Sequence, residues 1–560
     1  MKNYSNIPAR KHFLLNITTV LTVAALTACQ PASPSYESGM QKNSAAKKDL
    51  ALDGAAEKPI PAEAPAVVAY SPAAVYDVQE TAPHVTNTER YQKQPDQPVK
   101  AVAQEPVSTF SIDVDTGSYA NVRRFLNDGG LPPEDAVRIE EIINYFPYNY
   151  PLPTGTHPFA IHTQTVDSPW QPEAKLVKIG IQAQDTAKKN LPPANLVFLV
   201  DVSGSMNSPD KLPLVKKALR LLTQQLRAQD KVTIITYASG EKLVLPPTSG
   251  KDKDTILRAV NSLEAGGATS GERALRMAYD EAQKAFVKNG INRILLATDG
   301  DFNVGVADTE TLKSMVAEKR KSGISLSTLG FGADNYNEEM MEQIADAGDG
   351  NYSYIDSEKE AKKVLQHQLT STLATVAQDV KIQVEFNPAA VKEYRLVGYT
   401  NRTLRNEDFN NDKVDAGDIG SGHSVTALYE IIPQGKTGWL ADSRYQKAPA
   451  ADGSKNEYAY VKVRYKLPGQ SASKLIEQPV PARSIPLAQA DADTRLALAA
   501  ASYAQQLRGG EYNGKLDWNA IEKMAAATRA RDPYGLIAEF RELVGIAKSL
   551  SSKQPEKQGE

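Results

Sequence analysis

Residues 195–206 read Asn-Leu-Val-Phe-Leu-Val-Asp-Val-Ser-Gly-Ser-Met, and they indicate the fold class of the chain. The continuous apolar run at 196–200 predicts a strand that is buried on both faces of a parallel sheet. The run stops abruptly at Asp201. Apolar residues at helical spacing follow from Pro213 onward and predict a helix there. A buried strand, a short polar loop and a helix together indicate one unit of an α/β fold.

The polar loop carries three oxygen-bearing side chains at alternate positions, Asp201, Ser203 and Ser205. Ligands of open α/β sheets bind where the strands end at their carboxyl edge. One carboxylate and two hydroxyls at that edge are hard oxygen ligands, suited to Mg²⁺ or a similar cation. Asp and Ser are also common in turns and helix caps, so this stretch alone leaves a purely structural role open.

The Asp-Val-Ser-Gly-Ser motif at 201–205 resembles the Asp-x-Ser-x-Ser signature of von Willebrand factor type A domains. In those domains the signature forms the metal-ion-dependent adhesion site. The resemblance implies that Asp201, Ser203 and Ser205 are ligands of Mg²⁺, with Mn²⁺ or Ca²⁺ as alternatives. It also implies an open coordination position that takes an Asp or Glu carboxylate from a protein partner.

Two later segments match the rest of the family's site. The glycine-rich stretch Gly-Gly-Ala-Thr-Ser-Gly at 266–271 stands where the family's loop supplies a threonine ligand. We assign that role to Thr269, with Ser270 as the close alternative. A second buried apolar strand ends at Asp299, which matches the last carboxylate of the family's site. Asp301 is one step further and is expected to serve the turn or to support the ligands.

The rest of the A domain, predicted over residues 194–370, alternates strands with amphipathic helices. This alternation predicts an α/β doubly wound, Rossmann-like sheet. The expected strands are 232–237, 243–245, 293–298 and 324–329, and the expected helices are 255–263, 272–286, 309–321 and 338–347.

A period-two pattern appears on both sides of the A domain. Residues 175–184 alternate apolar and polar side chains, which predicts a half-exposed strand, and the pattern returns after residue 376. Such a strand needs partners that bury its apolar face, and the doubly buried A-domain sheet is unsuited to that. We therefore expect a β-sandwich of residues 157–190 and 376–482, with the A domain inserted in it or flanked by it. Its core is predicted to combine Val177, Ile179 and Ile181 with Val380, Ile382, Val384, Val461 and Val463.

The N-terminal residues 1–28 have a positive start and a short apolar run, as in a secretory signal peptide. Leu-Thr-Ala-Cys at 26–29 resembles the lipobox of bacterial lipoproteins, which implies cleavage before Cys29 and palmitate-type lipidation of it. Cys29 is the only cysteine of the chain. In lipoproteins of this kind an Asp after the cysteine favours inner-membrane retention, so Gln30 implies the outer membrane if the cell is Gram-negative. An ordinary signal peptide with an incidental cysteine is the alternative.

The remaining segments complete the predicted organisation. Residues 29–106 are rich in Pro and Ala and are expected to be a disordered tether. Residues 107–156 are predicted as a helical N-terminal extension with helices at 119–126 and 132–146. Residues 490–550 are predicted as C-terminal helices, followed by a disordered tail at 551–560. Asp113 and Asp115 are interpreted as turn residues, and the Asp- and Asn-rich stretch 406–418, which lacks the EF-hand pattern, as a solvated loop.

The stretches 110–146 and 394–430 resemble the conserved extension and the C-terminal domain of a family of bacterial A-domain lipoproteins. The sequence does not favour an enzyme: there is no Gly-x-Ser-x-Gly elbow, no P-loop and no pair of histidines at metal spacing. A metal-dependent hydrolase, in which Asp201 and Asp299 orient a water, is the minor alternative. A net charge of −3 does not favour nucleic acid, and no nucleotide is expected. The sequence predicts a membrane-anchored, divalent-metal-dependent adhesion or scaffold protein. The alternative is a structural or assembly factor of the cell envelope, in which the metal only orders the loops.

Overall fold

The computed structural model describes residues 88–93, 95–268, 271–300, 309–368, 371, 373–441 and 456–553. The predicted signal peptide, Cys29, Thr269, Ser270 and Asp301 lie outside the described residues. Within the described ranges, no helix has both the length and the apolar character needed to span a membrane.

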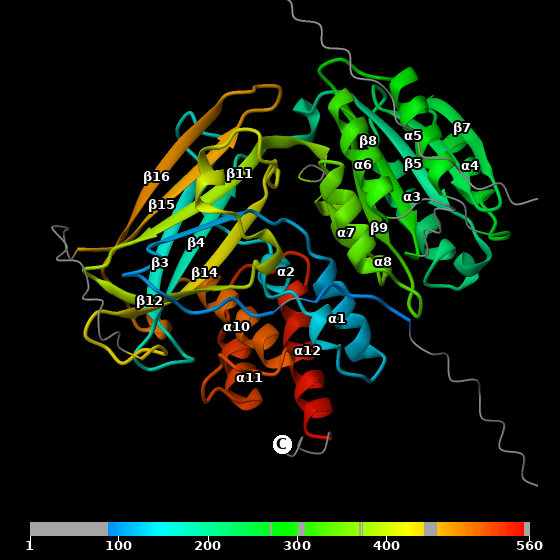
Figure 1. The fold of residues 1–560 in the computed structure, drawn as a ribbon. Coiled ribbons are helices and arrows are strands. Elements are labelled where there is room, and N and C mark those ends of the chain that lie inside the picture. The colour runs from blue at the N-terminus through cyan, green and yellow to red at the C-terminus, as the bar shows by residue number, and fades with distance from the viewer. Residues whose placement is uncertain are drawn as a thin grey trace, which may run out of the picture. The chain divides into compact units, whose positions relative to one another are not determined.

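The A domain is built on a six-stranded sheet in the order β10-β9-β8-β5-β6-β7 (Figure 1). Strand β7 is antiparallel to β6, and the other neighbours are parallel. The strands are β5 (Ala194–Asp201), β6 (Lys231–Tyr237), β7 (Glu241–Ser249), β8 (Ile291–Thr298), β9 (Ser325–Gly330) and β10 (Tyr352–Tyr354). The prediction of a doubly wound α/β sheet is confirmed.

The central strand β5 explains why its sequence is apolar without interruption. Leu196 and Phe198 belong to the hydrophobic core on one face of the sheet, and Val197 and Leu199 to the core on the other. Residues of α3 (Leu212–Gln225), α4 (Lys253–Asn261) and α8 (Glu358–Lys362) pack into the first core. Residues of α5 (Glu272–Lys284), α6 (Thr309–Lys319) and α7 (Glu338–Ala347) pack into the second.

The flanking strands form a β-sandwich of two sheets. One sheet is β1 (Lys100–Ala101), β12 (Val391–Val397), β14 (Ser424–Pro433), β4 (Lys175–Ala183) and β3 (Phe159–Asp167), in that order. The other contains β2 (Val107–Ser111), β11 (Thr375–Phe386), β13 (Ile419–Gly420), β15 (Glu457–Lys466) and β16 (Ser473–Pro481).

The pairing of β4 with β14 confirms that the A domain is inserted in the sandwich. Ile179, which precedes the A domain, lies opposite Ala427, which follows it. The predicted core is also confirmed, since one buried cluster contains Val177, Ile179, Ile181, Val380, Ile382, Val384, Val461 and Val463.

The expectation that the strand at 175–184 is half-exposed was wrong. The side chain of Lys178 in β4 is only 3% exposed. Its ammonium lies 3.2 Å from a carboxylate oxygen of Asp491 and 4.7 Å from the centre of the Tyr150 ring. A lysine stem can be covered by apolar neighbours while its charge is satisfied by a partner, so the polar positions of a strand need not face water.

The helical part packs on the outer face of the β14–β4 sheet. Helices α10 (Ala492–Leu507), α11 (Trp518–Ala527) and α12 (Leu536–Ser551) share one core with α1 (Gly117–Asn127), α2 (Ile139–Asn144), Leu176 and Leu428 (Figure 1). The predicted C-terminal helices are confirmed. Asp517 caps α11 by accepting a hydrogen bond of 2.8 Å from the Ala520 backbone N–H.

Two predictions about the N-terminal segments need correction. The tether does not extend to residue 106, because Lys100–Ala101 pairs with β12 and Val102 is buried. The extension is not wholly helical: β2 pairs with β11, and the expected helix at 132–146 is interrupted. The backbone of Arg138 is extended there (φ −97°, ψ 113°), which places its guanidinium against glutamates of the A domain.

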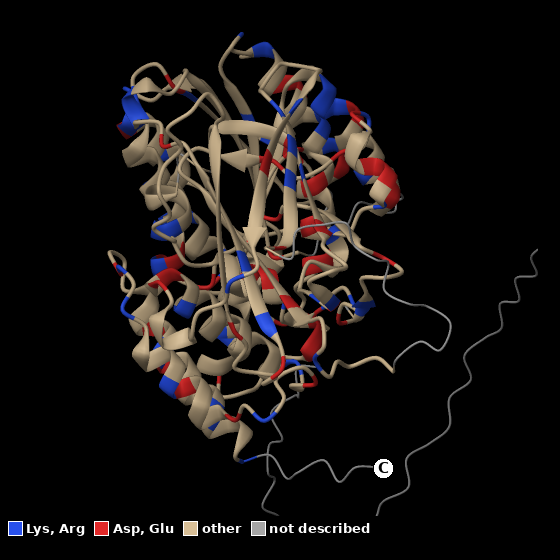
Figure 2. Ribbon diagram, turned by 90° about the vertical axis from the view of Figure 1, so that its left-hand side faces the viewer, with Lys and Arg blue, Asp and Glu red and all other residues tan. Residues whose placement is uncertain are grey.

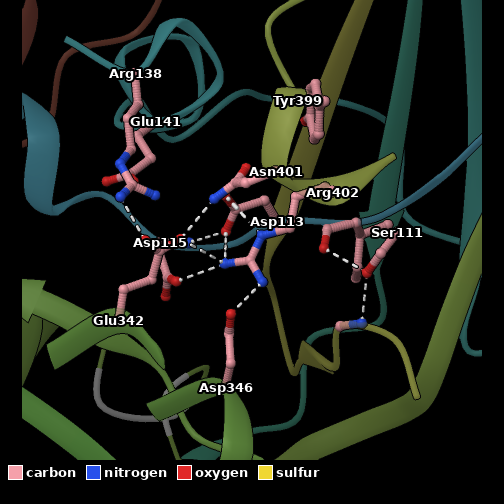
Figure 3. Close-up of polar contacts among 12 residues, drawn as sticks. Ser111, Asp113, Asp115, Arg138, Glu141, Glu342, Asp346, Tyr399, Asn401 and Arg402 are labelled. Atoms are coloured by element: carbon pink, nitrogen blue, oxygen red, sulfur yellow. Dashed lines mark hydrogen bonds and ion pairs between the residues drawn. The ribbon is translucent and has the colours of Figure 1, made fainter. Parts of the chain in front are cut away.

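Arg402, in the loop after β12, joins the sandwich and the extension to helix α7 of the A domain (Figure 3). Its guanidinium lies 3.4 Å from Asp113, 3.2 Å from Asp115, 3.3 Å from Glu342 and 2.6 Å from Asp346. The turn prediction for the two aspartates holds locally, since the Asp115 N–H donates to Asp113. Both aspartates are nevertheless buried and bind the arginine, a role that the sequence did not reveal.

Candidate metal centre

The candidate site lies where two neighbouring parallel strands end. Asp201 is the last residue of β5, and Asp299 follows the last residue of β8. The strands are paired up to Val200 and Ala297, so their carboxyl ends share one edge of the sheet. Both carboxylates have 0% exposed surface. The fold therefore brings together the two carboxylates that the sequence places about a hundred residues apart.

Asp201 is held rigidly by hydrogen bonds. The Ser203 backbone N–H donates to its Oδ1 at 2.8 Å, and the Thr298 hydroxyl donates to its Oδ2 at 2.9 Å. Burial raises the pKa of the Asp201 carboxyl to about 6; the Ser203 hydrogen bonds oppose this shift, and Asp299 adds to it. A cation bound beside it would favour the ionised form, as opposite charges do.

The two serines present their hydroxyls side by side. Ser203 precedes a short 3₁₀ turn (Gly204–Asn207), and its Oγ lies 3.0 Å from Oγ of Ser205. Adjacent ligands of an octahedral Mg²⁺, each at about 2.1 Å from the ion, are separated by about 3 Å. The spacing of the hydroxyls therefore fits two neighbouring positions of such a shell.

The glycine-rich loop lies against this turn. The Gly204 N–H donates to the Gly267 carbonyl at 2.9 Å, and Gly267 has a φ of +90°, which favours glycine. The predicted ligand Thr269 and its alternative Ser270 follow two and three residues later but lie outside the described residues. Their assignment remains a prediction.

Asp299 has two partners that the sequence did not predict, Lys211 and Asn335. The Lys211 ammonium lies 3.0 Å from Oδ2 of Asp299, and the Asn335 amide donates to the same oxygen at 3.4 Å. Lys211 also donates to the side-chain oxygen Oδ1 of Asn335 at 3.1 Å. The sequence held one indication of this pairing. Lys211 lies at the start of a helix, where the helix dipole disfavours a cation, so an anionic partner for it could have been expected.

The residues present fit a divalent cation by their chemistry. The described part of the site offers two carboxylates and two hydroxyls, all oxygen donors of the kind that Mg²⁺, Mn²⁺ and Ca²⁺ prefer. Among the described residues, no group of three or more His, Cys, Asp or Glu side chains is arranged to hold a metal. A metal at this edge would therefore depend on the serine hydroxyls.

Comparison with known proteins agrees with the fold of the A domain. The family model described as von Willebrand factor type A domain matches residues 195–368, and one described as von Willebrand factor matches residues 85–178. The fold and this match define a protein of the von Willebrand factor type A class. This class often mediates metal-dependent protein interactions.

The chain matches one relative over most of both lengths. It is 48% identical over 483 residues to "Uncharacterized protein YfbK" of Escherichia coli (strain K12), covering 84% of this chain and 83% of the relative. A family model described as "Uncharacterized protein YfbK, C-terminal" matches residues 371–550. The chain therefore belongs to the YfbK family of bacterial A-domain proteins.

More distant relatives share only part of the chain. Inter-alpha-trypsin inhibitor heavy chain H3 of Mesocricetus auratus is 25% identical over 268 residues, which is 44% of this chain and 30% of that protein. A solved von Willebrand factor type A structure from Catenulispora acidiphila is 16% identical and covers 66% of this chain and 87% of that chain, with a TM-score of 0.38.

Proposed function

We propose that this protein is a membrane-anchored lipoprotein that binds a protein partner through a divalent cation. The observation that carries the proposal is the buried Asp201 carboxylate beside the paired Ser203 and Ser205 hydroxyls, at the strand edge that it shares with Asp299. Membership of the A-domain class supports it.

In this proposal Asp201, Ser203, Ser205, Asp299 and Thr269 hold Mg²⁺, with Mn²⁺ or Ca²⁺ as substitutes. The bound cation supplies an electrophilic coordination position for a carboxylate. The protein's own residues hold the Asp201 and Asp299 carboxylates and the serine hydroxyls in place. The partner is a protein that presents an Asp or Glu side chain, and the role is adhesion or scaffolding rather than catalysis.

The proposed location is the cell envelope. Cys29 carries the lipid anchor, and Gln30 after it favours the outer membrane in a Gram-negative cell. The Pro- and Ala-rich residues that follow Cys29 are proposed as a tether to the described part of the chain, which begins at residue 88. Figure 2 shows acidic and basic residues mixed over helices and strands, which gives no support to a nucleic-acid partner.

The proposal is tested by metal-dependent stabilisation. Mg²⁺ or Mn²⁺ should raise the melting temperature of the wild-type protein, and the rise should be absent in Asp201→Ala. Partner binding that survives both a chelator and Asp201→Ala would instead support a structural role in the envelope, with the metal ordering the loops.

A further inference from the structure

We propose that Lys211 sets the charge of the metal centre, and that its ammonium gives the centre its preference for an acidic partner. The inference rests on the proposed metal site and deepens it. Lys211 is not expected to be a metal ligand, because an ammonium has no lone pair to donate. It acts through Asp299 and is a specificity-determining residue.

The first support is the position of the ammonium. It binds Oδ2 of Asp299 at 3.0 Å and the Asn335 side-chain oxygen at 3.1 Å. The Lys211 side chain is 10% exposed and Asp299 is fully buried. The pair is thus largely shielded from water. In such surroundings the interaction between two charges is stronger than at the protein surface.

The second support is a slot in the fold that fits the lysine stem. Gly332 follows β9 with a φ of +78°, and a Cβ built on it would lie 2.3 Å from Cε of Lys211. The Gly332 carbonyl accepts a hydrogen bond of 2.7 Å from the Tyr354 hydroxyl, which fixes this stretch in place. A glycine is therefore required at 332 for two reasons, its backbone conformation and the closeness of the lysine.

Lys211 also lies at the N-terminus of a helix, a position that is unfavourable for a cation. Lys211 is the residue that precedes the first turn of α3. The positive end of the helix dipole repels a cation there. The carboxylate of Asp299 offsets this repulsion, so the lysine and the carboxylate form one unit.

A charge count shows what the lysine changes. The carboxylates of Asp201 and Asp299 together cancel the charge of a divalent cation. Lys211 adds one positive charge to this group, so the loaded centre remains cationic. Two effects follow: the lysine weakens binding of the metal by repulsion, and it strengthens binding of an anionic ligand on the metal.

Because the two effects have opposite signs, an experiment can distinguish a charge-setting role of Lys211 from a role in which it only orients Asp299. If Lys211 only oriented Asp299, its loss would weaken metal binding and carboxylate binding together. If it sets the charge, removal of the charge should strengthen metal binding and weaken carboxylate binding. Lys211→Gln removes the charge but keeps an N–H donor, whereas Lys211→Arg keeps both.

The experiment uses the detergent-solubilised full chain, with Mn²⁺ as the metal and sodium acetate as the carboxylate. Calorimetry gives the Mn²⁺ affinity, and the water-proton relaxation of bound Mn²⁺ reports displacement of water by acetate. Lys217→Gln is the matched control, because Lys217 lies on the same helix, is 54% exposed and loses the same charge.

We expect Lys211→Gln to bind Mn²⁺ on the order of tenfold more tightly than wild type and acetate on the order of tenfold more weakly, each equivalent to about 1.4 kcal/mol. Lys211→Arg and Lys217→Gln should behave as wild type. Mn²⁺ binding by Lys211→Gln that is equal to or weaker than that of wild type would overturn the inference but leave the metal site. Absence of Mn²⁺ binding by wild type would overturn both.

Discussion

The guanidinium of Arg138 lies 3.2 Å from Oε2 of Glu338, and both side chains are completely buried. Arg138 belongs to the N-terminal extension, and Glu338 is the first residue of α7 in the A domain. The same guanidinium also pairs with Glu342 and, at 3.4 Å, with Glu141. The A domain is therefore joined to the extension by buried charges, in addition to the two chain connections that its insertion creates.

Removal of the Arg138 charge should destabilise the protein strongly. Arg138→Met leaves three buried glutamates without this partner, and breaking a buried ion pair costs about 3–5 kcal/mol. Urea unfolding at pH 7 measures the loss. Lys548→Met is the control, because it breaks a pair with Glu522 that is 37% and 47% exposed, and should cost at most about 1 kcal/mol. Similar losses in the two variants would show that the Arg138 cluster contributes little.

His423 should make the protein sensitive to acid. Burial, with Lys363 as a second cause, lowers the pKa of His423 to about 4, and its Nδ1 has no hydrogen-bond partner among the residues that the structure describes. His423 takes up a proton near pH 6.5 in the unfolded chain but only near pH 4 in the folded chain. Its contribution to the free energy of unfolding is therefore fully present above pH 6.5 and is lost as the pH falls towards 4. The contribution lost between pH 7 and pH 5 is about 2 kcal/mol.

The measurement is urea unfolding of wild type and His423→Asn at both pH values. The drop in stability from pH 7 to pH 5 should be about 2 kcal/mol smaller in the variant, because asparagine does not titrate. An identical drop in both proteins would assign the acid sensitivity to other groups.

Gly332→Ala tests the slot around Lys211. Gly435 has nearly the same backbone conformation, φ +79° against +78°, but no described residue has an atom within 4 Å of a Cβ built on it. Gly435→Ala therefore suffers backbone strain alone, about 1 kcal/mol. Gly332→Ala adds the clash with Lys211 and should lose about 2 kcal/mol more in the free energy of unfolding. Equal losses in the two variants, measured by urea unfolding, would mean that the lysine is not tightly packed there.

Cys29→Ser tests the anchor. The substitution removes the thiol that would carry the lipid, so the protein should persist as an uncleaved precursor without palmitate. Metabolic palmitate labelling and membrane fractionation detect this change. Palmitate incorporation at the wild-type level would contradict the lipobox assignment.

The sequence was informative wherever a residue's surroundings follow a short-range pattern. The apolar run of β5 predicted a strand buried on both faces, and the structure shows this. The period of two in β4 predicted a partner strand from after the A domain, and in the structure Ile179 lies opposite Ala427 of that strand. The carboxylates Asp201 and Asp299 each end a buried strand and were recognisable from that context. Their proposed role as metal ligands is a separate prediction.

The features that were missed depend on contacts between distant segments. Lys178 looked exposed because its neighbours alternate, but Asp491 and Tyr150 cover it from far along the chain. The partnership of Lys211 with Asp299, separated by 88 residues, has no local signature beyond a lysine at a helix start. The strands β1 and β2 were assigned to a tether and to a helical extension because they have two and five residues, too few for a clear period.

The proposed function depends on a bound metal, and the thermal stabilisation that the metal gives can be measured. The melting temperature of the full chain is recorded with a chelator and with Mg²⁺ or Mn²⁺, for wild type, Asp201→Ala and Asp299→Ala. Asp280→Ala, which removes a carboxylate that is 65% exposed, is the control. A metal at a hundredfold excess over its Kd stabilises the folded state by about 2.7 kcal/mol. We expect a metal-induced rise in wild type and Asp280→Ala and none in the two site variants; an equal rise in all four proteins, or no rise in wild type, would contradict the proposed site.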